Sequence, residues 1–404
     1  MSQEEAGHGS ESGREQVLGV GGAWAMAVGG MIGGGIFSTL GVVISVAGEW
    51  AWLSFLMGGV IALATGHSYS GLTRQIGKAG GSYAYLRALG RDRLARVVVW
   101  VLVLGYTLTV AVYAVTFGAY AAYALSAPAW IRDGAALAAI ALLAGVNLAG
   151  AAKANTLEKV AVWGKLAILL GLAGIGLAHW APDRLVLEAN QPVGFAGALV
   201  GMGVVFMAYE GFQLLSYDYA DMKDAKRTIA RAMPAAIVTT AVTYIVVAIG
   251  AAMLAGASQI VAHKEVALAI AGREALGTFG FLAVSLAATF SAASAINATI
   301  FATARLALQA AEEGEMPAAF ARRDSEGAPW AGTVLISAVA MGLTLIGGIE
   351  ALVEGASFVF LGVFALVNWI AIERRIPHHW AAMVGLAGSG GGAVMLVLHL
   401  AGQV

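Results

Sequence analysis

The chain has 404 residues, of which 59% are hydrophobic and 12% are charged, and its formal net charge is −1. Soluble domains carry roughly 25% charged residues, so this composition leaves too little polar surface for a water-soluble globule. It also lacks the excess of positive charge typical of proteins that bind nucleic acid. No cysteine is present, which excludes disulfides, thiolate metal sites and a cysteine nucleophile.

Residues 1–16 are polar and rich in glutamate, and the first apolar run has no positive segment before it. We therefore expect a short disordered cytoplasmic tail rather than a signal peptide. Residues 17–404 should form a single transmembrane domain. Because a bilayer core needs about 20 apolar residues per helix, we predict eleven spanning helices, near 17–46, 50–72, 94–125, 133–150, 159–180, 195–219, 231–256, 279–310, 331–348, 351–372 and 380–402.

The basic residues indicate how these helices are oriented, because cytoplasmic loops carry more Lys and Arg than external ones. With the N-terminus in the cytoplasm, nineteen of the 23 basic residues fall on the inner side. The four outer ones are Arg132, Arg184, Lys264 and Arg273. We therefore expect a multi-pass protein of the cell membrane and, since eleven is odd, a C-terminus outside the cytoplasm.

Five glycines fall within the seven residues 29–35, about halfway along the first predicted helix. Each glycine weakens a helix by roughly 1 kcal/mol relative to alanine. We predict a helix break at mid-membrane, whose freed N–H and C=O groups can bind a carboxylate and an ammonium. The alternative is close packing of an intact helix through small residues.

The sixth predicted helix contains an acidic residue, Glu210, deep in the membrane and followed by Gly211. A carboxylate at that depth costs about 2.5 kcal/mol or more, so it indicates a functional site unless a neighbouring helix satisfies it. Gly211 permits a second helix break. Breaks five helices apart predict an inverted repeat, with residues 17–180 and 195–372 as its halves and 380–402 as an extra helix.

Several stretches resemble the amino acid–polyamine–organocation permeases, which share the leucine-transporter fold. They are, in order, 31–41 (MIGGGIFSTLG), 77–86 (GKAGGSYAYL), 206–212 (FMAYEGF), 221–232 (DMKDAKRTIARA) and 294–317. The resemblance spans residues 17 to about 375 and implies an all-α membrane protein of five plus five helices with the first and sixth broken. The family usually has twelve helices, whereas we expect eleven in this sequence.

The resemblance also implies roles for residues that match the family's motifs. The substrate-binding residues it implies are Met31, Ile32, Gly33, Gly34, Gly35, Met207, Tyr209, Glu210 and Gly211. The position that often holds an aromatic gate aligns with Met207, and a neighbour, Phe206 or Tyr209, takes that role; we assign it to Phe206.

In some proton-coupled relatives, a lysine of the fifth helix takes the place of a sodium ion between helices one and eight. Lys165 matches that position, and Ser291 and Ser294 are its expected hydroxyl neighbours and coupling partners. The alternatives are a lysine that extends to the cytoplasmic interface and serines that only pack helices together.

These features predict a secondary active transporter of amino acids or related amines, proton-coupled and working by alternating access. An exchanger, or a nutrient sensor without net transport, would use the same helices. No phosphate-binding loop or HExxH motif is present, so we expect neither an ATP-driven pump nor an enzyme, and no cofactor or metal. The expected partners are a small-molecule substrate, protons and the lipid bilayer, but no nucleic acid.

Overall fold

A computed structural model describes residues 18–149, 155–187, 194–324 and 327–403, so the predicted tail at 1–16 lies outside the described residues. All regular elements of the described chain are helices, apart from one isolated parallel bridge between Leu18 and Met222. The α-helices are α1 (Val20–Ala47), α2 (Ala51–Ile76), α3 (Gly81–Ala88), α4 (Asp92–Ala124), α5 (Ala129–Leu148), α6 (Asn155–Ala178), α7 (Phe195–Val204), α8 (Phe206–Tyr209), α9 (Ala225–Ala255), α10 (Ala257–Ala262), α11 (Ala267–Glu312), α12 (Trp330–Ile346), α13 (Ile349–Glu373) and α14 (His379–Leu400).

Helix length and hydropathy agree with a membrane protein of many spans. Within the described residues, eight helical stretches are long and apolar enough to cross a bilayer, and the bent pair α7 and α8 makes a ninth. One of the eight, Val20–Ile76, contains both α1 and α2, and the apolar α12 is slightly shorter than a full span. Each of the eleven predicted segments therefore contains a helix.

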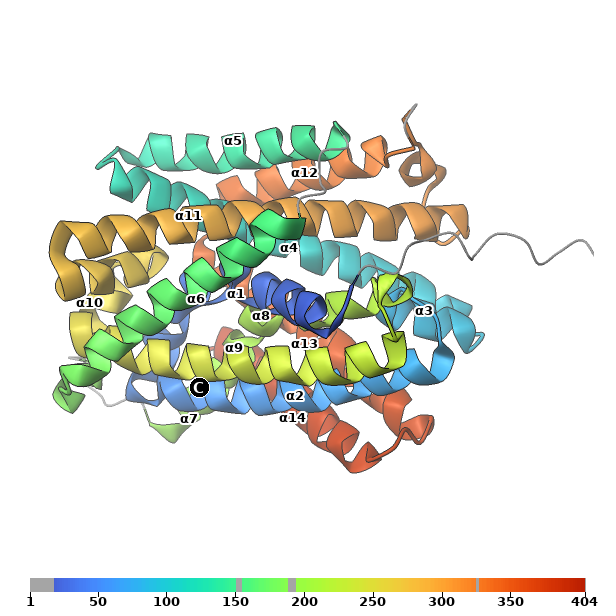
Figure 1. Ribbon diagram of the computed structural model, residues 1–404, viewed down its shortest axis with the longest axis horizontal. Helices are drawn as coiled ribbons and strands as arrows, with labels where there is room; N and C mark the ends of the chain where they lie inside the picture. Colours follow the sequence, from blue (N-terminus) through green and yellow to red (C-terminus); the bar gives the residue numbers. More distant parts are fainter. Residues whose placement is uncertain (1–17, 150–154, 188–193, 325–326, 404) are drawn as a thin grey trace, which may run out of the picture.

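The eighth predicted segment, 279–310, lies within a longer helix than expected. α11 bends at Leu276 and Gly277, where Gly277 has a φ of 59° that side-chain-bearing residues rarely adopt. The predicted segment is the part after this bend. The part before it belongs, with α10 and the 3-10 turn η5 (Lys264–Val266), to a compact cap at one end of the molecule (Figure 1).

α1 lies in the middle of the bundle, and its residues are buried along most of its length. It contacts α6, α7, α8, α9 and α11, whereas α5 and α14 lie at the periphery with exposed apolar faces. In Figure 1, α5 and α12 lie on one flank of α11, and α2, α9 and α14 lie on the other. A helix that is apolar all round is expected at the centre of such a bundle.

Helices at equivalent places in the two predicted halves pack against each other. α2 contacts α9, α4 contacts α11, and α5 contacts α12. An inverted repeat places equivalent helices about a pseudo-two-fold axis in this way. The division at 17–180 and 195–372 remains a prediction, and these contacts are compatible with it.

Ion pairs join α3 and α4 to the end of α11, on the predicted cytoplasmic side. Arg87 Nε lies 2.9 Å from Glu313 Oε2, and Arg96 Nε lies 2.6 Å from Glu315 Oε2. The Tyr83 hydroxyl also donates to Glu313. Partial burial raises the pKa of Glu313, but hydrogen bonds from Gln309 and Tyr83 and the charge of Arg87 outweigh it, so this pKa lies below its ordinary value. The network is therefore present at neutral pH and is lost only as the pH falls through the lowered pKa.

The opposite end is closed by the cap. The backbone of Lys264 lies so near α1 that a Cβ atom added at Gly41 would be 2.4 Å from the Lys264 Cα. The Lys264 ammonium pairs with Glu350 of α13, and Glu265 pairs with Arg132 of α5 at 3.0 Å. The cap is thus attached to α1, α5 and α13 at once.

Candidate functional site

The two glycine-containing motifs of the sequence meet in the structure. A Cβ atom added at Gly30 would lie 3.5 Å from the Gly211 Cα, and one added at Gly211 would lie 2.8 Å from the Met31 nitrogen. The backbones of α1 and of the chain after α8 therefore touch without intervening side chains. This direct contact places the expected substrate-binding residues of both helices in one region at the centre of the bundle.

The break in the sixth helix is where the sequence predicts it. α7 and the chain from Phe206 to Ser216 are bent by 45°. Glu210, the first residue after α8, has an extended conformation with ψ 138°, and Gly211 follows with φ 130°. Side-chain-bearing residues rarely adopt that φ, so a glycine allows the chain to turn there.

The predicted break in the first helix is absent. α1 is continuous from Val20 to Ala47, including Gly33, Gly34 and Gly35. Added Cβ atoms would lie 3.2 Å from the Ala295 Cβ at Gly33, 2.0 Å from the Tyr113 ring at Gly34, and 2.4 Å from the Tyr244 hydroxyl at Gly35. The three glycines therefore let α11, α4 and α9 approach α1 closely. The predicted break was wrong, and the alternative, close packing of an intact helix through small residues, is what the structure shows.

Side chains of neighbouring helices nevertheless bind the backbone of this glycine-rich turn. The Tyr244 hydroxyl lies 2.6 Å from the Met31 carbonyl oxygen and 2.9 Å from that of Ala208. The Ser291 hydroxyl donates to the Ile32 carbonyl at 3.2 Å. Tyr244 therefore joins α1 to α8, and Ser291 lies beside the first helix as the resemblance implies.

Glu210 is buried at the break with 3% exposure. Its Oε1 atom accepts a hydrogen bond from Gln213 Nε2 at 2.9 Å, and Gln213 Oε1 accepts one from the Gly211 N–H at 2.9 Å. The amide of Gln213 thus satisfies a backbone group that the break leaves unpaired and holds the Glu210 carboxyl group in place. Sequence reasoning missed Gln213, although it lies two residues after the glycine of the motif.

The other residues of the sixth helix point in different directions. The Met207 N–H donates to Ser357 of α13, and the Met207 sulfur lies 3.9 Å from the Ser38 hydroxyl of α1. The Tyr209 hydroxyl donates to the Phe55 carbonyl of α2 at 2.7 Å. Phe206 is fully buried with its ring centroid 5.9 Å from that of Phe364. Met207 therefore faces α1, whereas Phe206 and Tyr209 pack against other helices.

The three residues expected to couple protons lie in different environments. Lys165 is 5% exposed on α6, which packs against both α1 and α11, and it is the only buried Lys or Arg among the side chains that the structure describes. Ser291 contacts α1, as described above. The placement implied for Ser294 is not found, because Ser294 is exposed. It is about 100° around the helix from Ala295, the residue that packs on Gly33.

Tyr113 of α4 is a second residue that sequence reasoning did not place at the site. Its ring covers Gly34, it is 1% exposed, and its hydroxyl has no hydrogen-bond partner. A signal existed in the sequence, because Tyr106, Tyr113 and Tyr120 recur every seven residues on one face of the helix.

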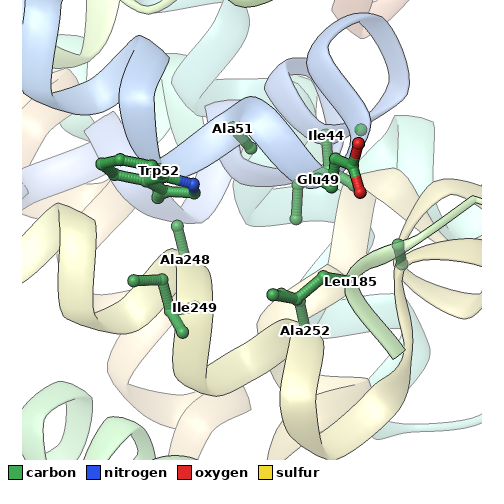
Figure 2. Close-up of a pocket in the computed structure, with 10 residues that line it drawn as sticks. Ile44, Glu49, Ala51, Trp52, Leu185, Ala248, Ile249 and Ala252 are labelled. Atoms are coloured by element: carbon green, nitrogen blue, oxygen red, sulfur yellow. The ribbon is translucent and has the colours of Figure 1, made fainter. Parts of the chain in front are cut away.

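A small hollow lies elsewhere, between the ends of α1, α2 and α9 and the turns beside them. Figure 2 shows Trp52 of α2 facing Ala248 and Ile249 of α9 across it, with Glu49 nearby. It has space for about one water molecule. Ile44, which lines it, is ten residues beyond Gly34 and so about 15 Å further along α1. It is therefore separate from the site around Glu210.

The chain is similar to known proteins along most of its length. The sequence profile of the family described as amino acid permease matches residues 18–398. An uncharacterized protein of Methanocaldococcus jannaschii is 28% identical over 362 residues, which are 87% of this chain and 82% of that protein. The inner membrane transport protein YbaT of Escherichia coli is 26% identical, covering 92% of this chain and 87% of its own.

A further relative carries a more specific name. The serine/threonine exchanger SteT of Bacillus subtilis is 24% identical over 403 residues, covering 95% of this chain and 91% of its own. The family profile spans nearly all of the described bundle, from the start of α1 to the end of α14. The chain therefore belongs to the amino acid permease family, within the amino acid–polyamine–organocation superfamily.

Proposed function

We propose that the protein is a secondary active transporter that moves amino acids or related amines across the membrane by alternating access, coupled to protons. The observation that supports this most is the buried Glu210 beside Gly211, at a helix break that lies directly against the glycines of α1. A buried charge at mid-membrane is retained when it has a function. Membership of the amino acid permease family supports the class of substrate.

The substrate lies, in this proposal, between the glycine-rich turn of α1 and the break after α8. Glu210 supplies a negative charge for the substrate's ammonium group. Gln213 binds its Oε1 atom, and Oε2 is the oxygen left for the substrate. The wall is formed by Met31, Ile32, Met207 and the glycines 33–35 and 211, since the glycines leave space when the neighbouring helices separate. Tyr209 supports this wall from the α2 side, and Phe206 acts as the gate by moving with the break.

Lys165 is the proposed coupling residue, with Ser291 of α11 as its expected hydroxyl partner. An ammonium group in the place of a sodium ion would hold α1 and α11 together, and loss of its proton would release them. Burial disfavours the charged form of a lysine, which is the physical basis for proton release in this proposal. Ser294 is exposed, which leaves Ser291 as the better supported hydroxyl partner.

Exchange of one amino acid for another is the alternative mechanism, and the name of the Bacillus subtilis relative favours it. A sensor that binds substrate without transport would use the same residues. The N-terminus is proposed to face the cytoplasm. An enzymatic activity is not proposed, since the relatives with functional names are transporters.

Uptake into proteoliposomes tests the proposal. The purified protein is reconstituted and given radiolabelled amino acids and polyamines under an imposed pH gradient, with and without sodium. We expect accumulation that follows the pH gradient and needs no sodium. Lys165→Ala should lose the response to pH, whereas Lys226→Ala, an exposed lysine after the helix break, should keep it. Strict sodium dependence, or pH-driven accumulation by Lys165→Ala, would contradict proton coupling, and uptake only into preloaded vesicles would establish exchange.

Substitution of Glu210 tests its role in the site. Glu210→Gln keeps the side-chain shape and can still accept the hydrogen bond from Gln213, but it removes the charge. We expect the affinity for substrate to fall about ten- to a hundredfold, because a hydrogen bond to a charged group is lost. Unchanged affinity, transport rate and pH dependence would show that Glu210 is only structural.

A further inference from the structure

The turn between α13 and α14, residues 374–379, presents a group of basic side chains to the surroundings. The exposed members of this basic turn are Arg374, Arg375, His378 and His379. Among the described residues, none of these four side chains forms an ion pair, and the neighbouring Glu373 is paired with Arg91 of the chain before α4. No acidic residue follows Glu373 in the sequence. The described part of the protein therefore leaves the charge of the two arginines unneutralised.

Contacts with α2 hold the basic turn in place. Ile376 is buried, and a Cβ atom added at Gly71 would lie 2.8 Å from the Ile376 Cδ1. The His67 Nε2 atom lies 2.7 Å from the carbonyl oxygen of Pro377. Gly71 is five residues before the end of α2, so the turn lies against the side of α2, about 8 Å short of its end. The basic side chains are thus carried on a fixed turn that does not project beyond the bundle.

Exposed tryptophans and apolar residues flank the basic turn. Trp369, one helical turn before the end of α13, is 43% exposed, and Trp380 at the start of α14 is 64% exposed. The guanidinium group of Arg91 lies over the Trp369 ring, 4.8 Å from its centroid. Further along α14, Met383 and Val384 are exposed as well. Tryptophans gather where lipid headgroups meet the hydrocarbon of a bilayer, so the arginines lie at the level of the headgroups and the apolar side chains at that of the acyl chains.

We propose that the basic turn binds the headgroup of an anionic phospholipid in the leaflet predicted to be cytoplasmic, where such lipids give the surface its negative potential. Arg374 and Arg375 contact the phosphate, because a guanidinium group presents paired N–H donors that match phosphate oxygens. His378 and His379 offer further ring N–H donors. The acyl chains lie along Trp380 and the exposed apolar residues of α14.

The position of the turn favours a lipid over an acidic soluble protein as the partner. A soluble protein would need a surface that projects into the cytoplasm, whereas this turn lies short of the end of α2 and beside exposed tryptophans. The proposal concerns a site at the lipid-facing surface and does not depend on which substrate is transported, or on transport itself.

Binding of labelled lipids to the purified protein tests the proposal. Phosphatidylglycerol and phosphatidylcholine with the same fluorescent acyl chain are titrated with delipidated protein in neutral detergent, and the fluorescence anisotropy is recorded. We expect phosphatidylglycerol to bind more tightly. Arg374→Gln with Arg375→Gln should lower its affinity about ten- to thirtyfold, since each basic residue near an anionic surface contributes about a factor of five. The affinity for phosphatidylcholine and the thermal unfolding midpoint in lipid-free detergent should not change.

Lys226→Gln with Arg227→Gln is the matched control, because it removes the same charge from exposed residues on the same predicted side. Those residues follow two acidic ones, Asp221 and Asp224, so this variant should keep the preference for phosphatidylglycerol. Equal binding of the two lipids by the wild type, an unchanged preference in the arginine variant, or the same loss in the control would overturn the proposal. Displacement of the lipid by inorganic phosphate at constant ionic strength would also overturn it, since the site would then recognise free phosphate.

Discussion

Glycines of α1 show how the absence of a side chain determines which helices can meet. A Cβ atom at Gly34 would lie 2.0 Å from the Tyr113 ring, a distance that no real contact allows. The ring belongs to α4, so either the tyrosine or a whole helix would have to shift. Gly174 of α6 differs, because an added Cβ there meets nothing within 4 Å. Substitutions at Gly34 and Gly174 can therefore distinguish the effect of glycine on helix packing from the effect of its low helix propensity.

Gly34→Ala should destabilise the protein by about 1–3 kcal/mol, because it overpacks the contact with Tyr113. Thermal unfolding in detergent measures this change. Gly174→Ala is the control and should leave stability unchanged or raise it by up to about 1 kcal/mol, since alanine favours the helix. The double variant Gly34→Ala, Tyr113→Ala should recover part of the loss. Equal stability of Gly34→Ala and the wild type would contradict the observed contact.

In the proposed alternating-access cycle, elements outside the central site would control whether it opens. The cap formed by α10, η5 and the start of α11 lies over α1 and is paired to α13 and α5 through Lys264–Glu350 and Arg132–Glu265. Each of these pairs is partly exposed and stabilises the closed arrangement by only about 0–1 kcal/mol. Two such pairs can hold the cap closed and still break during a transport cycle.

Covalent closure of the cap should stop transport. The chain has no cysteine, so Lys264→Cys with Glu350→Cys introduces two thiols in the place of an ion pair, and a short bifunctional thiosulfonate reagent can join them. Cross-linking should lower uptake at least tenfold and a reducing agent should restore it, because α10 and η5 can then no longer leave α13. Each single-cysteine variant is a control and should be insensitive to the reagent. Full transport by the cross-linked double variant would show that the cap does not move.

At the scale of the whole molecule, the orientation in the membrane follows from the uneven distribution of basic residues. Eleven spans would place the end of α14 on the side opposite the start of α1. The loop after the helix break, with its exposed Lys226, should be cytoplasmic, and the turn around the exposed Asp183 should be external.

Labelling of intact cells with a membrane-impermeant maleimide tests this topology in the cysteine-free chain. Asp183→Cys and Gly402→Cys should react in intact cells, and Lys226→Cys should react only after permeabilisation. All three positions are exposed, so access to the reagent depends on the side of the membrane alone. Reaction of Lys226→Cys in intact cells would reverse the orientation, and failure of Gly402→Cys to react would change the number of spans.

The sequence alone determined the helical class, the approximate position of the long apolar helices and the break at Glu210 and Gly211. These features depend on local properties, namely apolar length, a charge within an apolar run and a residue free to adopt positive φ. The resemblance also led us to expect Lys165 beside the first helix, and the structure places it buried on α6. None of this required knowledge of which helices touch.

Only the tertiary structure decided what the glycines of α1 do and which polar groups accompany them. A run of glycines is compatible with a broken helix or with close packing, and the choice depends on Tyr113, Tyr244 and Ala295, which come from three other helices. For the same reason the sequence could not separate Ser291, which contacts α1, from the exposed Ser294, or pair Gln213 with Glu210. Periodicity places a residue on a face of its own helix, but the direction of that face is set by how all the helices pack together.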